Sequence, residues 1–246
     1  ICFGSVGYWV IVDISTHLKF SLYTLNTKLV LIITVILLVT GSIFFFFSEQ
    51  YNALDDLQLL DKVVVSFFES ASGRTAGFTS VNYNITAHYT NFFVMILMFI
   101  GGASASVAGG TKVNTLGVVM ANLSSTIRGK KATSVFRREI PEEQVHRATT
   151  IILIGIISVV MVTMILTLTE SDKDIGFANI LFESVSALGT NGLSTGITAI
   201  LSVWGHLVLI VAMFVGRMGP LALSISMTMQ RETVPYKYAK ERVTLG

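Results

Sequence analysis

The chain alternates between long apolar runs and polar connectors. Three runs, 29–47, 149–168 and 204–229, consist mostly of aliphatic and aromatic residues. Each is close to the roughly 20 residues that a helix needs to cross a bilayer, so each predicts a complete membrane span. Residues 1–12 are apolar but too short to cross, and we interpret them as the last turns of a helix that begins further upstream.

A short stretch between these spans occurs twice, at 68–79 and 182–194. Each copy opens with Phe-Glu-Ser-x-Ser, which predicts a short helix, and continues into a Thr-x-Gly turn. The turns consist of Thr75, Ala76, Gly77 and Phe78 in the first copy and of Thr190, Asn191, Gly192 and Leu193 in the second. The glycines lie 192 − 77 = 115 residues apart and the opening phenylalanines 182 − 68 = 114, so the second copy holds one extra residue. The apolar part is too short to cross a membrane and predicts a re-entrant segment.

A short helix followed by a glycine turn between two spans is typical of a pore loop. Glycine adopts backbone angles that are closed to other residues, which lets carbonyl groups turn inward and replace the water shell of an ion. Threonine hydroxyls add ligands, and the negative C-terminal end of the short helix favours a cation. The plainer interpretation is a pair of surface loops that contain glycine. Recurrence in two matching units favours the pore, and oxygen ligands suit hard monovalent cations.

The segment 91–125 is apolar at both ends and rich in glycine in the middle. That middle consists of Gly101, Gly102, Ala103, Ser104, Ala105, Ser106, Val107, Ala108, Gly109, Gly110, Thr111 and Lys112. Glycine costs about 1 kcal/mol relative to alanine inside a helix, so this composition predicts two half-helices joined by an intramembrane loop. The segment lacks the Gly-x-x-x-x-Gly-Lys-Ser/Thr order of a phosphate loop, which argues against a nucleotide site there.

Arg217 stands near the middle of the last apolar run. An arginine at bilayer depth costs between roughly 3 and more than 10 kcal/mol, so it needs a partner and a purpose. We expect carbonyl groups at the end of the broken segment as its partners. A positive charge near the conduction path would act as an electrostatic barrier below the filter. Lys112, which closes the glycine loop, either does the same or reaches toward the cytoplasm.

Three charged residues belong to the doubled stretch. Glu69 and Glu183 occupy equivalent places, early in the two predicted short helices. A carboxylate near a helix N-terminus is stabilised by the helix dipole, and it can make an outer vestibule attractive to cations. Arg74 precedes the first Thr-x-Gly turn and has no counterpart in the second copy. We expect it to hold the turn from behind, because a cation on the path would repel the permeant ion.

Composition and charge indicate a membrane protein and its orientation. Hydrophobic residues make up 52% of the 246-residue chain and charged residues only 13%, against about a quarter in soluble domains. The positive-inside rule predicts cytoplasmic connectors at 13–28, 124–147 and 231–246, with acidic loops at 49–66 and 170–180 outside. Both re-entrant segments then enter from outside, and the two units form a parallel repeat. The net charge of +2 gives no indication of nucleic-acid binding, and the single cysteine excludes an internal disulfide.

Together, these segments resemble the Trk/Ktr/HKT superfamily of potassium transporters, most closely its KtrB-type membrane subunits. The resemblance covers essentially the whole chain. The two Thr-x-Gly turns fall on the filter segments of that superfamily, 101–112 is similar to its intramembrane gating loop, and Arg217 falls on an arginine thought to face this loop. The loop departs from the family pattern, which has a proline and a longer glycine run where Ala105 and Val107-Ala108 stand.

The resemblance implies an all-α membrane protein of tandem parallel M1–P–M2 repeats, like those of potassium channels, with re-entrant pore loops. Four such repeats surround one pore in that family, and this chain matches the third and fourth. The implied division is the end of the second repeat at 1–14, a cytoplasmic connector at 15–28, the third repeat at 29–125, a basic cytoplasmic loop at 126–148, the fourth repeat at 149–230 and a cytoplasmic tail at 231–246. Two turns cannot complete a fourfold ring, so we expect the first two repeats upstream of Ile1 and no conduction by this chain alone.

The resemblance also implies a function and partners. The implied function is K⁺ uptake across the plasma membrane, often dependent on Na⁺, by a homodimer in the lipid bilayer. A cytosolic nucleotide-binding ring of the KtrA type would regulate it, and the nucleotide would bind to that ring. We expect no organic cofactor, nucleic-acid partner or enzymatic activity of this chain.

Three alternatives stay open. A Na⁺-conducting or Na⁺/K⁺ member of the same superfamily would carry the same motifs, because nothing in the composition distinguishes the two ions. A secondary transporter for a small organic solute would also use re-entrant loops at the membrane midplane, but with an inverted repeat. An intramembrane enzyme using Glu69 and Glu183 lacks the nucleophile–base pair or metal triad that catalysis requires.

Overall fold

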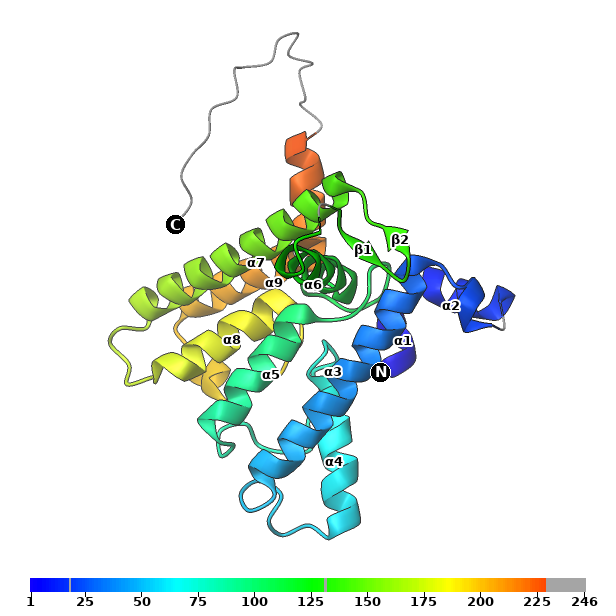
Figure 1. Cartoon of the computed structure of the whole chain (residues 1–246). Coiled ribbons are helices and arrows are strands. Elements are labelled where there is room, and N and C mark those ends of the chain that lie inside the picture. The colour runs from blue at the N-terminus through cyan, green and yellow to red at the C-terminus, as the bar shows by residue number, and fades with distance from the viewer. Residues whose placement is uncertain (18, 131, 229–246) are drawn as a thin grey trace.

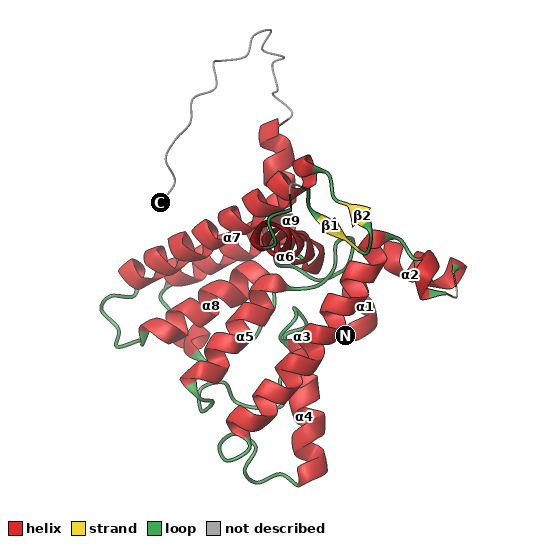
Figure 2. Ribbon diagram, viewed as in Figure 1, coloured by secondary structure: helices red, strands yellow, loops and turns green. Residues whose placement is uncertain are grey.

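The computed structural model describes residues 1–17, 19–130 and 132–228, and nearly all of its regular structure is helical (Figure 2). The cytoplasmic tail expected at 231–246 lies outside the described residues. The helices fall into two successive units, preceded by a short N-terminal segment and separated by the basic connector.

The first unit contains four helices. They are α3 (Leu25–Glu49), α4 (Leu59–Ser72), α5 (His88–Ile100) and α6 (Val113–Ile127). Helix α3 begins before the predicted span at 29, because the Thr24 side chain accepts the Thr27 N–H at 3.3 Å and caps the helix. Lys28, expected in a polar connector, lies inside α3 and donates to the Ser21 carbonyl at 2.9 Å. Helices α5 and α6 are the two half-helices predicted for 91–125.

The second unit contains three helices and one 3-10 turn. They are α7 (Glu142–Thr169), α8 (Phe177–Gly189), the turn η2 (Ile197–Ile200) and α9 (Val203–Thr228). Helix α7 begins at Glu142, before the predicted span at 149. Its first turns are polar, so the hydrophobic pattern did not reveal them. Arg147 pairs there with Glu143 one turn earlier, at 2.6 Å. The apolar run therefore marks the span, whereas the helix continues into the connector.

The two units pack into one body. Figure 1 shows α7, α8 and α9 together on one side, α3 with α4 on the other, and α5 between them. Helix α5 packs on α8, and α6 packs on α7. The largest buried apolar cluster combines side chains from both units: Phe45, Leu54, Tyr83, Val94, Met95, Met98, Phe182, Val185 and Leu193.

The N-terminal segment forms two short helices, α1 (Cys2–Val6) and α2 (Tyr8–Thr16), where the sequence predicted the end of one helix. The break lies at Gly7, whose φ is 89°. A Cβ added to Gly7 would lie 2.5 Å from the Ser104 carbonyl oxygen. The glycine therefore allows the loop at 101–112 to approach the N-terminal segment. A 3-10 turn, η1 (Phe20–Leu22), then leads to α3.

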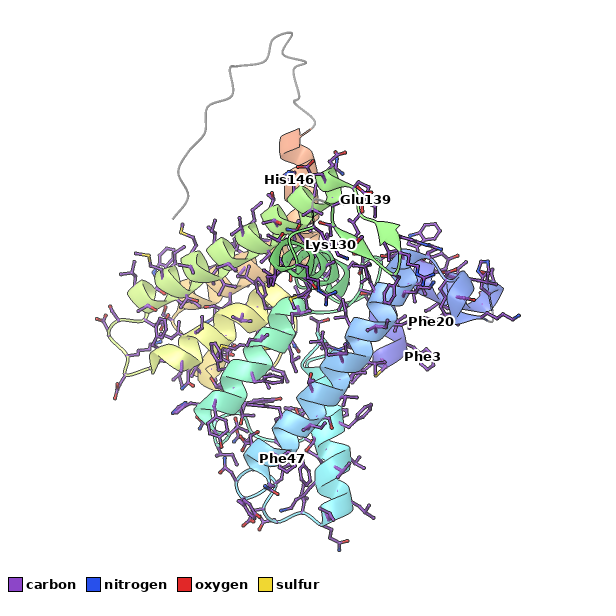
Figure 3. The ribbon with its side chains drawn as sticks, viewed as in Figure 1. Phe3, Phe20, Phe47, Lys130, Glu139 and His146 are labelled. Carbon is purple, nitrogen blue, oxygen red and sulfur yellow. The ribbon has the colours of Figure 1, made fainter. Side chains whose placement is uncertain are left out.

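Part of the basic connector forms a small antiparallel hairpin of β1 (Ser134–Val135) and β2 (Arg138–Glu139). Its two turn residues, Phe136 and Arg137, have positive φ angles of 50° and 60°, as in the tightest hairpin turns. The sequence predicted an all-α fold, because two-residue strands are too short to show an alternating pattern. Lys130, Glu139 and His146 lie in this region (Figure 3).

Two helices, Leu25–Glu49 and Glu142–Thr169, are long and apolar enough to cross a membrane. Shorter apolar helices are α5, α6, α8 and the part of α9 from Val203 to Met218. Large apolar side chains remain exposed on the long helices, such as Phe47 on α3 (66%, Figure 3) and Leu168 on α7 (67%). Extensive exposed apolar surface marks an interaction site or a membrane, and on helices of this length it favours lipid.

Candidate functional site: two Thr-x-Gly turns above a glycine-rich loop

The structure brings the two Thr-x-Gly turns together. Asn191 is buried and donates from Nδ2 to the Gly73 carbonyl oxygen at 2.8 Å, across 118 positions of sequence. A Cβ added to Gly77 would lie 2.0 Å from the Asn191 carbonyl oxygen. The two predicted filter segments are thus in direct backbone contact.

Both turns use left-handed backbone. The φ angles are 73° at Thr75, 74° at Gly77, 50° at Thr190 and 100° at Gly192. A non-glycine residue in this region costs roughly 1–2 kcal/mol, and such strain is concentrated at functional sites. The extra residue of the second copy lies in the helix, because α8 continues to Gly189, directly before its turn.

The threonine hydroxyls of the two turns have no hydrogen-bond partner in the described part of the chain. The oxygens concerned, Thr75 Oγ1 and Thr190 Oγ1, are both buried. A buried hydroxyl without a partner costs about 1–3 kcal/mol. Among the described residues, no group of three or more histidine, cysteine, aspartate or glutamate side chains is placed to hold a metal ion. The two buried hydroxyl oxygens without a partner are candidate cation ligands.

The last serine of each Phe-Glu-Ser-x-Ser motif binds its turn from behind. Ser72 Oγ donates a short hydrogen bond to the Phe78 carbonyl oxygen, and Ser186 Oγ accepts the Gly192 N–H at 3.2 Å. Sequence analysis gave these serines no role, although their equivalent positions in the two copies were a signal. The motif recurs together with the turn because its side chains hold that turn.

Glu69 and Glu183 are not near the N-termini of their helices, so the predicted stabilisation by the helix dipole is wrong. Helix α4 begins at Leu59, within the loop expected up to residue 66, and Glu69 therefore lies in its last turn. Glu183 lies in the middle of α8. Both side chains are buried, at 0% and 5% exposure, although Glu183 borders a cavity that the second turn and Arg217 also line. Each glutamate accepts hydrogen bonds from the segment that follows its turn.

The glycine-rich segment 101–112 begins at the end of α5, and its last two residues return to the same place. The Thr111 N–H donates to the Phe99 carbonyl at 3.0 Å, and the Lys112 N–H donates to the Ile100 carbonyl at 2.9 Å. Residues 101–112 therefore form a loop between the ends of α5 and α6, as predicted, and the helices meet where the loop closes.

Glycines allow this loop to be compact and to lie against the second turn. Gly101 and Gly110 have φ angles of 68° and 76° and lie in contact where the loop closes. A Cβ added to Gly109 would lie 2.2 Å from Thr190 Oγ1 and 2.4 Å from the Gly189 carbonyl oxygen. The loop backbone is thus in direct contact with the predicted filter.

The N-terminal segment holds one side of the loop. The Ala103 N–H donates to the Ser5 carbonyl at 2.8 Å, and the Tyr8 N–H donates to the Ala105 carbonyl at 3.0 Å. Within the described chain, α1 and α2 therefore act as a support for the loop, a role that the sequence did not indicate.

Arg217, on α9, also binds the loop. Its Nη1 donates to the Val107 carbonyl oxygen at 2.6 Å, so its partner is a loop carbonyl, as expected from the sequence. Lys112 turns back into the loop and donates to the carbonyl oxygens of Ala108 and Gly109. Two positive charges therefore lie at the loop, and Lys112 does not extend away from it.

The remaining predicted residues take different positions. Arg74 is 1% exposed and donates from Nη2 to Ser5 Oγ at 3.3 Å, which fits a residue behind the first turn. Leu193 packs in the shared core, whereas Phe78 is 67% exposed. The fourth residues of the two turns are thus equivalent in backbone position only.

Sequence analysis missed two buried carboxylates at the ends of the long helices. Glu49, the last residue of α3, accepts the Ala87 N–H at 3.0 Å and the Thr90 hydroxyl at the start of α5. Glu170, directly after α7, accepts the Ser202 N–H at 3.0 Å at the start of α9. Each carboxylate therefore caps the helix that follows the doubled stretch. The signal was an acidic residue two positions after each apolar run, which was interpreted only as part of an acidic loop.

The environment of Glu170 also changes its ionisation. Burial raises the pKa of the Glu170 carboxyl, but hydrogen bonds from Lys173 and Ser202 outweigh this effect and lower the pKa below 4.5. The Lys173 ammonium lies 2.8 Å from the carboxylate. Glu170 is therefore a charged cap at neutral pH.

Known proteins resemble this chain in sequence and in fold. The model of the TrkH family, described as cation transport protein, matches residues 8–234. The chain belongs to this family. It is similar to the Ktr system potassium uptake protein B of Bacillus subtilis, with 36% identity over 91% of this chain and 50% of that protein. It is also similar to the potassium/sodium uptake protein NtpJ of Enterococcus hirae, with 35% identity over 99% of this chain and 55% of that protein. The chain thus spans about half the length of these relatives.

The fold is also similar to a solved structure. The crystal structure of the potassium transporter TrkH from Vibrio parahaemolyticus superposes with a TM-score of 0.67, at 16% identity, over 92% of this chain and 50% of that one. At this identity the likeness shows a shared fold. The predicted membership of the Trk/Ktr superfamily and the resemblance to KtrB-type subunits are confirmed by the family match and the Ktr relatives.

Proposed function

We propose that this chain supplies the third and fourth membrane–pore–membrane repeats of a potassium uptake protein. The observation that carries the proposal is the direct contact of the two Thr-x-Gly turns, with Gly77 against the Asn191 carbonyl. The segments 75–78 and 190–193 would then be two of four filter segments around one pore, with both re-entrant stretches entering from outside. The printed names of similar proteins, which take up potassium or potassium and sodium, support the choice of ion.

In this proposal the filter binds K⁺ through oxygen atoms only. Backbone carbonyls of the turns and the hydroxyls of Thr75 and Thr190 replace water molecules around the ion. Helices α4 and α8 end at the turns, so the partial negative charge of their C-terminal ends stabilises a cation there. K⁺ is the transported substrate, and Na⁺ is either a coupling ion or a second substrate.

The loop at 101–112 would act as a gate together with Arg217. Its backbone at Gly109 lies against Thr190 and so obstructs the exit from the filter. The guanidinium bound to Val107 adds a positive charge, which repels a cation most strongly where water is scarce. Opening requires the loop to move away from the filter, and breaking the Arg217 contact favours that movement.

Substitution of the filter glycines tests the filter. In the full-length protein in liposomes, Gly77→Ser or Gly192→Ser should lower the ratio of rubidium to sodium uptake, because a side chain at positive φ displaces the carbonyls around it. Both variants should still insert into the membrane. An unchanged ion preference in both variants would contradict the proposal that 75–78 and 190–193 are filter segments.

Arg217→Ala tests the gate. Uptake of rubidium at equal amounts of protein should rise by roughly tenfold, as estimated from the loss of one hydrogen bond to a charged group. Shortening the loop within 101–110 should raise uptake as well. The matched control is Arg138→Ala, since this arginine is exposed in the hairpin far from the loop in sequence. Equal or lower uptake by Arg217→Ala would contradict the gate.

The proposed setting is the plasma membrane, with the basic connectors in the cytoplasm and the acidic loops outside. The division into repeats given by the sequence, from 1–14 to 231–246, follows from this arrangement. A homodimer and a cytosolic nucleotide-binding ring are the proposed partners, and the nucleotide would bind to the ring. A Na⁺-conducting uptake protein is the second candidate, favoured by the name of the Enterococcus relative. Sodium uptake that exceeds rubidium uptake in the same liposomes would select it.

A further inference from the structure

Glu69 binds the segment that follows the first filter turn with both of its oxygens. Ser80 donates to Oε1 from its N–H at 2.8 Å and from its hydroxyl at 2.9 Å. The Tyr83 hydroxyl donates to Oε2 at 2.8 Å, and the Thr79 hydroxyl lies 3.1 and 3.2 Å from the two oxygens. Glu69 and Tyr83 are only 0% and 1% exposed. Residues 79–83 are thus held to α4 by a carboxylate that is closed off from solvent.

Glu183 makes the equivalent contact in the second copy. The hydroxyls of Ser194 and Thr198 both donate to its Oε1, the latter at 2.9 Å. Ser194 in turn accepts the Gly196 N–H at 2.9 Å, so the carboxylate also orders the bend that follows. Ser194 corresponds to Thr79, since 194 − 79 = 115 is also the distance between the filter glycines. The same bond therefore occurs in both repeats.

The bound segments begin two residues after the filter glycines, since 79 − 77 and 194 − 192 both equal 2. The serines Ser72 and Ser186 hold the turns themselves from the same short helices. Each filter turn is thus fixed at two points by one Phe-Glu-Ser-x-Ser motif. Movement of Thr79 or Ser194 changes the direction of the carbonyls in the adjacent turn, because each of these residues lies only two positions after a filter glycine.

The contacts of Glu69 require a carboxylate, because donors face both of its oxygens, whereas the two donors named for Glu183 share Oε1. Every contact named for Glu69 and Glu183 is a donation from an N–H or O–H group to a carboxyl oxygen. An ionised carboxylate accepts on both oxygens, whereas a glutamine of the same shape presents an NH₂ group on one side. That group would face donors such as the Ser80 N–H and push the segment away from the helix.

We propose that Glu69 and Glu183 are positioning residues that set the ion selectivity of the filter by fixing the chain just beyond each filter glycine. The inference deepens the proposed function and rests on it, because it presupposes that 75–78 and 190–193 bind the ion. The two carboxylates do not touch the ion, and they act through the backbone of the turns.

The test uses Glu69→Gln and Glu183→Gln in the full-length protein, reconstituted in liposomes. The readout is the ratio of rubidium to sodium uptake at equal amounts of folded protein. Each variant should lower this ratio by about tenfold, because hydrogen bonds to a charged group become bonds to a neutral one and, at Glu69, an NH₂ group also faces a donor. The matched control is Glu49→Gln, since Glu49 is equally buried at 0% exposure but caps α5. The control should lower the melting temperature and leave the ratio unchanged.

Two milder variants keep the test decisive if a glutamine variant fails to fold. Tyr83→Phe removes one donor to Glu69, and Thr198→Val removes one donor to Glu183, while both carboxylates stay in place. Each should lower the ratio by about threefold, since a single hydrogen bond is lost. A purely structural role would lower the amount of folded protein and leave the ratio of the remainder unchanged.

The outcomes separate this inference from the proposed function. A lower ratio in the Glu69 and Glu183 variants but not in Glu49→Gln supports the positioning role. An unchanged ratio in all of these variants, while Gly77→Ser changes it, overturns the positioning role and leaves the filter in place. If Gly77→Ser also leaves the ratio unchanged, the filter is overturned and the inference with it.

Discussion

The two filter glycines are equivalent in sequence but not in their surroundings. A Cβ on Gly77 would lie 2.0 Å from the Asn191 carbonyl oxygen and 3.2 Å from the Gly192 Cα, whereas a Cβ on Gly192 would meet nothing closer than 3.7 Å. Gly77→Ala therefore adds a backbone clash to the roughly 1–2 kcal/mol of strain that any residue has at positive φ. We expect Gly77→Ala to lower the ratio of rubidium to sodium uptake several times more than Gly196→Ala, which also lies at positive φ but outside the turns.

Gly196→Ala is the matched control for strain without contact. Its φ is 90° and no atom lies within 4 Å of an added Cβ. This variant should lose a similar amount of stability to Gly192→Ala and keep the wild-type ratio of uptake. An equal loss of the uptake ratio in Gly196→Ala and Gly77→Ala would contradict the role of the contact between the two turns.

For single residues, the sequence predicts only those functional positions that leave a pattern in their own stretch of chain. The glycines of the turns and Arg217 stand out because they recur or because they interrupt an apolar run. The partners of Glu69 and Glu183 leave no such signal, since they follow the turn in a segment without periodicity and are brought back only by folding. For that reason the recurrence of the two glutamates was seen, but their position in the helix was predicted wrongly.

At the scale of elements, each long helix ends in a carboxylate that caps the helix after the doubled stretch. Glu170→Gln should lower the stability of the folded protein by about 2 kcal/mol at neutral pH, because a buried hydrogen bond to a charged group is lost. The pKa of Glu170 is lowered in the fold, so its contribution is fully present above pH 4.5 and disappears as the pH falls through the lowered pKa. The difference in melting temperature between wild type and variant should therefore shrink below pH 4.5.

Thermal unfolding in detergent at neutral and acid pH measures this difference. Asp172→Asn is the control, because Asp172 is an exposed acidic residue of the same loop and should change the melting temperature little at either pH. A constant difference for Glu170→Gln across the pH range would show that the carboxylate does not act through its charge. The cap itself could not be predicted, since Glu170 and Ser202 lie 32 positions apart and no motif links them.

At the scale of the whole molecule, hydropathy was sufficient to predict a mostly helical fold with apolar helices long enough to cross a membrane. The boundaries were less accurate, because helices such as α7 continue beyond the apolar run as polar, ion-paired turns. The hairpin at 134–139 and the break in the helix at Gly7 were not predicted either. Both depend on backbone angles and on a neighbouring segment, such as the Ser104 carbonyl beside Gly7, and not on the polarity of their own residues.

The orientation in the membrane is the remaining whole-molecule prediction, and single cysteines test it. Asp56, in the loop between α3 and α4, and Glu139, in the hairpin, are both exposed. The positive-inside rule places the acidic loop outside and the basic connector in the cytoplasm. In a cysteine-free full-length protein in intact cells, Asp56→Cys should react with a membrane-impermeant maleimide, and Glu139→Cys should react only after permeabilisation. Labelling of Glu139→Cys in intact cells would reverse the orientation, and the re-entrant segments would then enter from the cytoplasm, with the loop at 101–112 on the outer side of the filter.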